Sequence, residues 1–441
     1  MTLAVLAAAV ILLLFLIVKL KLNAFLALIL TSFAVGLANG MAATAVLQSV
    51  LKGIGDTMGG LALILVFGAT LGKMIEESGA AHSISNALTN LFGERRIEIS
   101  ILITGFLVGL PMIYNASFLV LIPLVYTLSA TTGRPLMALG IPLSSALSVA
   151  HGYLPPHPAP TSIAVLYGAD VNLTLLYGLI LAVPATLLAG PVLARFFRHI
   201  EVKPPAQFFQ AREFKASELP GIAVSTLTIL VPVLLMLCGA VASLAGLEGA
   251  AGDAVQFLSD PTMALLIAVL VSFYTLGLAR GREMDSLMKS MGSAAASVSM
   301  VLLIIAAGGA FKQILLDAGT GEAIKELAAG IAVSPLVLAW SASALLRLAL
   351  GSATVAAITA AGIVLPMIPG SGVAPELLVL ATAAGSLMFS HFNDIGFWMF
   401  KEYYNVSVRQ TFQIWTVMES IVAVVGLLGT LALSRIVPAG G

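Results

Sequence analysis

The segment HGYLPPHPAP (151–160) lies in the middle of an apolar stretch and contains four prolines between positions 155 and 160. Proline cannot continue a helix, because it has no amide hydrogen and its ring collides with the preceding turn. Apolar, helix-like sequence nevertheless flanks the segment, and each flank is too short to span a bilayer alone. We therefore predict a discontinuous membrane helix over 136–168 with an unwound break at its centre. The alternative is a surface loop between two short helices.

The composition requires lipid as the solvent for most of the surface. Hydrophobic residues make up 59% of the 441 residues and charged residues 10%, whereas a soluble domain carries about 25% charged residues. The formal net charge is zero, so nucleic acid is not an expected partner. The single cysteine, Cys238, cannot form an intrachain disulfide, and the sequence has no Cys/His spacing typical of a metal site.

Ten apolar runs have about the length of a spanning helix. They cover residues 2–18, 22–42, 58–77, 136–168, 173–195, 219–246, 261–279, 293–317, 376–402 and 411–435. We expect the first run to be a retained helix rather than a signal peptide, because no basic residue precedes it and no cleavage site follows.

Two further stretches, 100–129 and 334–368, are too long for one upright helix at about 1.5 Å per residue. Each has small polar residues or helix-disturbing residues near its centre. We predict two re-entrant hairpins, each of two half-length helices whose tip lines a polar cavity. A single long, kinked and tilted helix is the alternative for each stretch.

Basic residues predict the orientation in a cell (inner) membrane. Those between residues 197 and 218 mark the clearest cytoplasmic loop. Arg96, Arg134, Lys401 and Arg409 fall on the same side if the stretch 100–129 enters and leaves the membrane from the cytoplasm. Both termini are then predicted to lie outside.

The two halves of the chain show weak internal similarity at a nearly constant offset. The matching pairs are Gly68 and Gly308, Gly79 and Gly319, Asn115-Ala116-Ser117 and Ser352-Ala353-Thr354, and His151 and His391. Because each half holds an odd number of spans, the second must enter the membrane from the opposite side, as in many secondary transporters. The predicted units are repeat 1 (1–197, with hairpin 100–129 and broken helix 136–168), a loop (198–218) and repeat 2 (219–441, with hairpin 334–368 and broken helix 376–402).

Polar residues within these apolar segments are candidates for function, since their burial in lipid is costly. Asn115 and Ser117 lie at the first predicted tip, and Ser352 and Thr354 lie at the second. Their hydroxyl and amide groups, with the amides of half-helix N-termini, can hold an anion or a hydroxylated ligand. The alternative is that these small residues only let helices pack closely.

Charged and titratable residues concentrate at the two breaks. Asp394 is a candidate to load and release a proton, because removal from water disfavours a charged carboxylate; a structural ion pair is the alternative. His151, His157 and His391 are rival proton carriers. Arg347 stands in an apolar run before the second tip, where its planar guanidinium suits a substrate carboxylate or Asp394.

Three long motifs resemble the gluconate permease (GntP-type) family of proton symporters. They are PPHPAP (155–160), LRLALGSATVAAITAAGIV (346–364) and SHFNDIGFWMFKEYY (390–404), supported by WTVME (415–419). The resemblance implies proton-driven import of gluconate or a related sugar acid or hydroxy acid, two hairpins with paired tips, and a homodimer with an elevator-type movement. It points to Ser352, Thr354, His391, Asn393, Asp394 and His157. Where the family often has an acidic residue, this chain has Asn115.

Three alternatives to proton symport stay open from the sequence. An intramembrane hydrolase would need an activated nucleophile, and the duplicated Ser and His positions favour a transport site instead. A channel would differ in its kinetics. Sodium coupling is the main rival to proton coupling, because backbone carbonyls at hairpin tips can bind Na⁺. We expect no cofactor.

Overall fold

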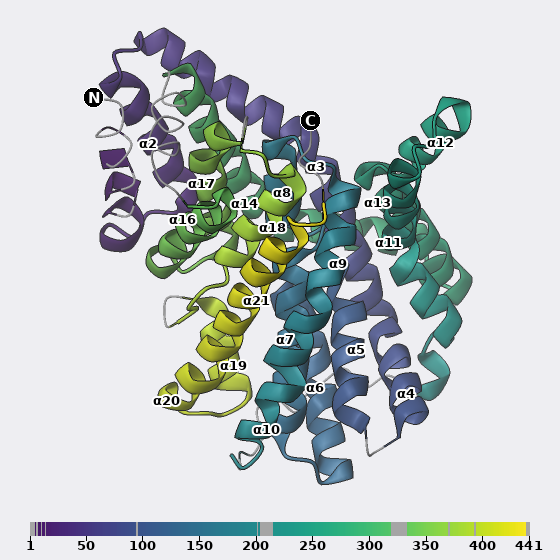
Figure 1. Ribbon diagram of the computed structural model, residues 1–441. Helices are drawn as coiled ribbons and strands as arrows, with labels where there is room; N and C mark the ends of the chain where they lie inside the picture. Colours follow the sequence, from purple (N-terminus) through teal and green to yellow (C-terminus); the bar gives the residue numbers. More distant parts are fainter. Residues whose placement is uncertain are drawn as a thin grey trace.

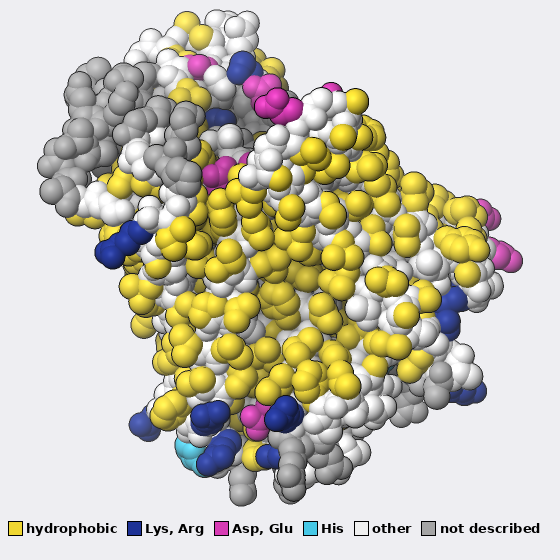
Figure 2. Space-filling view, turned by 45° about the vertical axis from the view of Figure 1, so that its right-hand side comes forward, with side chains coloured by type: hydrophobic (Ala, Val, Ile, Leu, Met, Phe, Trp, Pro, Cys, Tyr) yellow, Lys and Arg dark blue, Asp and Glu magenta, His cyan; other side chains and the backbone are white. Residues whose placement is uncertain are grey.

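The computed structural model describes residues 5, 8, 9, 11–13, 15–93, 96–200, 202, 215–318, 333–368, 371–391 and 394–437. All regular elements in these residues are helices (Figure 1), which confirms the predicted all-α membrane fold. Eight described helices are long and apolar enough to cross a membrane. Figure 2 shows a broad apolar band between two edges that carry the charged side chains. The predicted count of ten spans and two hairpins stays a prediction.

The described part of the first half contains a short π-helical turn, nine α-helices and a second π-helical turn before the last of them. In chain order these are η1 (Phe15–Lys19), α2 (Ala24–Ala38), α3 (Ala43–Ser78), α4 (Ala80–Phe92), α5 (Ile97–Gly109), α6 (Tyr114–Thr132), α7 (Leu136–Tyr153), α8 (Pro158–Tyr167), α9 (Val171–Leu187), η3 (Leu188–Val192) and α10 (Leu193–Phe197).

The second half repeats the order of a long helix, a helix pair, a broken helix and a final helix. Its described elements are η5 (Ala216–Glu218), α11 (Ile222–Leu244), α12 (Gly249–Ser259), α13 (Pro261–Ser272), η6 (Phe273–Gly277), η7 (Leu278–Arg280), α14 (Met284–Asp317), α16 (Pro335–Leu350), α17 (Ala353–Val364), η8 (Leu365–Met367), α18 (Pro375–Gly385), α19 (Ile395–Tyr403), α20 (Val408–Thr411), η9 (Phe412–Thr416) and α21 (Val417–Leu433). This order supports the repeat, and its inverted relationship stays a prediction.

Both predicted helix breaks are present. The Pro-rich segment ends α7 at Tyr153, and α8 begins with Pro158 at its first position, where a missing amide hydrogen costs nothing. The second break separates α18 from α19, and the Asp394 side chain caps α19 by accepting a hydrogen bond from Gly396 N at 2.9 Å. The chain thus forms two discontinuous helices at 136–168 and 376–402.

Each predicted hairpin stretch contains two helices separated by a short break, so the single kinked helix is wrong for both. In the second stretch, Gly351 ends α16 with φ at +73°, and the Ser352 side chain caps α17. In the first, α6 has 19 residues and α5 has 13. The arm α6 is longer than predicted, because the helix continues through Pro123 and ends only at Gly133, which adopts a left-handed conformation.

Two helices are longer than the sequence predicted. The predicted spans 58–77 and 293–317 belong to α3 and α14, which have 36 and 34 residues. Their additional first turns contain polar residues that lower the hydropathy but still support a helix. The two helices pack closely: a Cβ atom added at Gly53 would lie 2.7 Å from Ala310 Cα. Helices α4 and α12 were not predicted.

The elements with predicted cytoplasmic charges gather at one end of the molecule. Figure 1 places α10, α20 and the junction of α4 with α5 together at the lower end. Arg195 belongs to α10 and Arg409 to α20. This grouping supports the predicted common side for these charges, while the location of both termini outside stays a prediction. Part of the predicted first span and most of the loop 198–218 lie outside the described residues.

Candidate functional site

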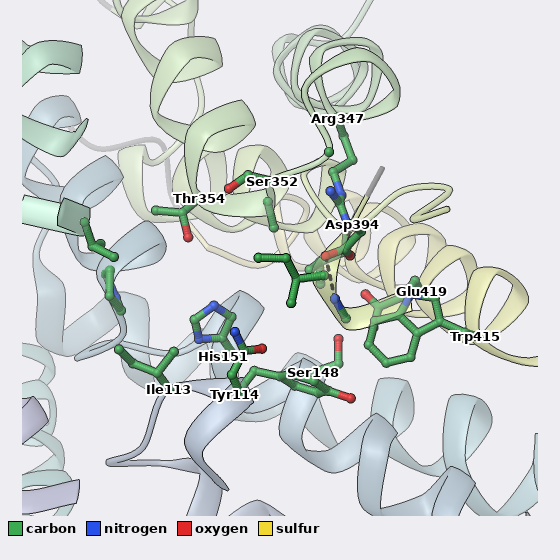
Figure 3. Close-up of a pocket in the computed structure, with 18 residues that line it drawn as sticks. Ile113, Tyr114, Ser148, His151, Arg347, Ser352, Thr354, Asp394, Trp415 and Glu419 are labelled. Atoms are coloured by element: carbon green, nitrogen blue, oxygen red, sulfur yellow. Dashed lines mark hydrogen bonds and ion pairs between the residues drawn. The ribbon is translucent and has the colours of Figure 1, made fainter. Parts of the chain in front are cut away.

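A cavity of about 290 Å³ lies where the two helix breaks and the two hairpin tips meet (Figure 3). Helices of both halves contribute to its wall, so the site is built from segments far apart in the sequence. The lining residues are Ile113, Tyr114, Asn115, Ser148, His151, Pro158, Val301, Arg347, Gly351, Ser352, Ala353, Thr354, Leu387, Asp394, Ile395, Gly396, Trp415 and Glu419.

Four helices begin at this cavity. Their first residues, or residues of their first turn, belong to its wall: Tyr114 of α6, Pro158 of α8, Ala353 of α17 and Ile395 of α19. A helix N-terminus has unpaired amide hydrogens and a partial positive charge. Four of them around one cavity make it attractive to an anion.

Arg347 adds a full positive charge to this wall. It is 2% exposed and forms an ion pair through Nη2 with Asp394 Oδ2. Its Nε and Nη1 atoms have no hydrogen-bond partner among the described residues. Unpaired buried donors on a guanidinium are costly, and a bound carboxylate would satisfy them. The two alternatives for Arg347, substrate or Asp394, are therefore compatible with each other.

Both carboxylate oxygens of Asp394 accept hydrogen bonds. Oδ1 accepts from Gly396 N, and Oδ2 accepts from Ser390 Oγ at 2.5 Å in addition to the Arg347 contact. Ser390 Oγ in turn accepts from Trp415 Nε1 at 2.8 Å. This network fixes Asp394 and Arg347 in place at the second break.

The two histidines of the first break form a chain of hydrogen bonds. His157 Nε2 lies 2.8 Å from Gly109 O, and His157 Nδ1 lies 3.3 Å from His151 Nδ1. Because a carbonyl only accepts, His157 Nε2 carries the hydrogen. When both rings are neutral, His157 Nδ1 accepts from His151, which leaves His151 Nε2 as an acceptor. His151 borders the cavity (Figure 3), so this acceptor is available to a ligand hydroxyl.

The structure separates the predicted site residues into two groups. Six of them line the cavity: Asn115, His151, Arg347, Ser352, Thr354 and Asp394. Three do not line it. Ser117 donates to the Ile113 and Tyr114 carbonyls. The His157 ring contacts the His151 ring, and His391 Nε2 lies 3.1 Å from Leu348 O. Asn393 lies outside the described residues.

The sequence reasoning gave no site role to Tyr114, Ser148, Trp415 or Glu419. Glu419 is 2% exposed, and its Oε1 accepts no hydrogen bond from the described residues; the Tyr114 hydroxyl is also without a partner there. A signal for Glu419 was present, because it is the only charged residue in the apolar stretch 411–433. The criterion that selected Arg347, a lone charge within a span, selects Glu419 equally well.

Comparison with known proteins agrees with this architecture. Residues 1–437 match the model of the GntP family permeases. The chain is 47% identical to the high-affinity gluconate transporter of Escherichia coli (strain K12) over 99% of this chain and 100% of that protein. It is 45% identical to the Gnt-II system L-idonate transporter of the same strain and 42% identical to the gluconate permease of Bacillus licheniformis, each with 99% and 100% coverage.

Two solved structures are similar in fold. The YdaH transporter of Alcanivorax borkumensis has a TM-score of 0.66 at 15% identity, over 95% of this chain and 99% of that one. MtrF of Neisseria gonorrhoeae has a TM-score of 0.61 at 13% identity, over 90% and 86%. The alternative of an intramembrane hydrolase is wrong, because the relatives at high identity are transporters. The chain is a multi-pass membrane transporter and belongs to the GntP permease family.

Proposed function

We propose that this protein imports gluconate or a closely related sugar acid together with protons. The observation that carries the proposal is the convergence of four helix N-termini and Arg347 on one cavity. Such a wall favours a carboxylate, because the helix N-termini carry partial positive charges and Arg347, although paired with Asp394, keeps two donors without a partner among the described residues. The printed names of relatives at 42–47% identity, which are transporters of gluconate or L-idonate, support this substrate class.

The remaining wall suits a ligand with several hydroxyl groups. Asn115, Ser352 and Thr354 offer amide and hydroxyl groups, and His151 offers a ring nitrogen. The volume of about 290 Å³ is at the lower end of the range of ~300–1,000 Å³ for small-molecule sites. A compact, polar substrate is therefore favoured over a large amphipathic one.

Proton coupling is supported by the titratable groups at the cavity. Asp394 and His151 line it, whereas His391 does not. Alternating access would expose the cavity first to one side and then to the other, and we propose an elevator-type movement of a homodimer by analogy with the family. Sodium coupling would need oxygen ligands from the hairpin tips and is treated as an outcome of the test.

The test is uptake of labelled D-gluconate into proteoliposomes with an alkaline interior, with and without sodium. We expect accumulation that a protonophore abolishes and that sodium does not change. Liposomes without protein and proteoliposomes without a pH gradient are the controls. If accumulation requires sodium, the coupling ion is Na⁺ and not the proton. If the folded protein does not bind gluconate but binds another hydroxy acid from a panel, that acid replaces gluconate as the proposed substrate.

A further inference from the structure

We propose that Glu419 carries the proton that enters with the substrate, and that Asp394 serves as a fixed counter-ion of Arg347. This inference rests on the proposed function and assigns its coupling step to a residue that the sequence reasoning did not select. Glu419 belongs to α21, lines the cavity and is 2% exposed. Figure 3 shows its carboxyl group directed toward the cavity beside Asp394.

Both oxygens of the Asp394 carboxylate are already engaged. Its two oxygens accept hydrogen bonds from Gly396 N, Ser390 Oγ and Arg347 Nη2. The bonds from Gly396 N and Arg347 Nη2 favour the ionised carboxylate, and the second comes from a full positive charge. Protonation of Asp394 would break this network and leave Arg347 buried without a partner. Asp394 is therefore already engaged as the counter-ion of Arg347.

Glu419, in contrast, forms no ion pair in the described part of the chain. Its Oε1 has no hydrogen-bond partner in the described part of the chain, and none of the described cations lies within 4.0 Å of it. The nearby Trp415 indole does not donate to Glu419, because it donates to Ser390 Oγ. The Ser148 hydroxyl faces Glu419 (Figure 3). A hydroxyl can donate to a carboxylate or accept from a carboxylic acid, so it permits both protonation states.

The charged and titratable groups around Glu419 come from four elements. The break before α19 supplies Asp394, α16 supplies Arg347, α7 supplies Tyr153 and His151, and α6 supplies Tyr114. Arg347 is paired with Asp394, and the Tyr153 hydroxyl donates to the Val422 carbonyl. None of these groups is therefore arranged to balance a negative charge on Glu419.

The charges that line the cavity also favour a protonated Glu419 when substrate is bound. Arg347 and Asp394 cancel each other. A bound sugar acid adds one negative charge, and an ionised Glu419 would add a second without a counter-ion. When a proton is added to Glu419, the second charge is removed and a carboxylic acid hydroxyl is available to the ligand. Substrate and proton thus favour each other's binding, and this coupling is reciprocal.

The experiment compares the wild type with Glu419→Gln, Asp394→Asn and Glu376→Gln. Glu376 is the matched control: it is a carboxylate outside the cavity whose Oε1 accepts from Asp170 N at 2.9 Å, a bond that glutamine can keep. Gluconate binding is measured in detergent across a pH series. Counterflow and pH-driven accumulation are measured in proteoliposomes.

For the wild type and Glu376→Gln we expect binding to weaken as pH rises, by up to about tenfold per pH unit, the limit for one linked proton. Glu419→Gln should bind gluconate with little pH dependence, retain counterflow and lose pH-driven accumulation. Asp394→Asn should weaken gluconate binding at every pH but keep the pH dependence of the wild type. If the pH dependence of gluconate binding persists in Glu419→Gln and disappears in Asp394→Asn, the inference is wrong and Asp394 carries the proton.

A second readout needs no substrate and separates this inference from the proposed function. Infrared difference spectra between acidic and alkaline buffer report the carbonyl band of a protonated carboxyl group. We expect this band in the wild type and in Asp394→Asn, and its loss in Glu419→Gln. If the wild type binds no gluconate but shows this pattern, the substrate is wrong and the proton site stands. If the band is unchanged in Glu419→Gln, the proton site is wrong whatever the substrate is.

Discussion

Arg347 and Asp394, 47 residues apart in the sequence, form a buried ion pair that ties the second helix pair to the break between α18 and α19. The pair engages Nη2 of the guanidinium and leaves Nε and Nη1 without partners among the described residues. One side of the guanidinium is thus held in place, and its remaining donors are unused. This arrangement is suited to a ligand carboxylate. Substrate binding should therefore depend on an arginine, and not merely on a positive charge, at position 347.

Arg347→Lys should raise the dissociation constant for gluconate by about tenfold to a hundredfold, since an ammonium group cannot satisfy Asp394 and a substrate carboxylate with the same planar geometry. Equilibrium binding to purified protein measures this. Arg282→Lys is the control, because Arg282 pairs with Glu77 at 2.8 Å outside the cavity. Equal affinity of Arg347→Lys and wild type would exclude a direct contact between Arg347 and the substrate.

The two histidines of the first break should respond differently to substitution. His157→Phe removes the hydrogen bond to the Gly109 carbonyl, so we expect a loss of about 1–3 kcal/mol in the free energy of unfolding. His151→Phe removes an acceptor at the cavity and should weaken binding of gluconate more than binding of a carboxylate of equal chain length without hydroxyls. Thermal unfolding and competition binding measure the two effects. An equal loss of both ligands would contradict the role of His151 in hydroxyl recognition.

Gly351→Ala should damage the second tip through backbone strain. Gly351 has φ at +73° and lines the cavity, and a left-handed conformation costs a residue with a Cβ about 1–2 kcal/mol. Gly133→Ala is the matched control, with φ at +67° at the exposed end of α6. Both variants should lose similar thermal stability, and only Gly351→Ala should raise the gluconate concentration for half-maximal uptake. A similar change in both would show that strain alone, and not the tip, is responsible.

Gly309→Val should weaken the packing of the two long helices α3 and α14. A Cβ atom at Gly309 would overlap Thr57 Oγ1 and lie 2.6 Å from Gly53 O, and overpacking of this kind costs about 1–3 kcal/mol or more. Gly292→Val, on the same helix, is the control, since an added Cβ there meets no atom within 4 Å. Thermal unfolding in detergent distinguishes the two variants. Equal stability would mean that the helices can separate at this crossing without cost.

The sequence by itself determined the features that depend on neighbouring residues. The apolar composition predicted a protein surrounded by lipid. The four prolines between 155 and 160 predicted the first helix break, and the glycine and serine at 351–352 predicted the second hairpin tip. These features follow from local chemistry, because a missing amide hydrogen or a left-handed glycine acts within one helical turn. The motifs also indicated the family.

Only the tertiary structure decided which of the polar residues share a cavity. Ser117 and His391 looked equivalent to Ser352 and Asp394 in the sequence, yet their side chains bond to nearby carbonyls away from the cavity. The direction of a side chain and the partner of a charge depend on helices far apart in the chain. For the same reason, Glu419 is distinguished from Asp394 only by the tertiary structure, in which Arg347 pairs with Asp394 and no cation of the described residues pairs with Glu419.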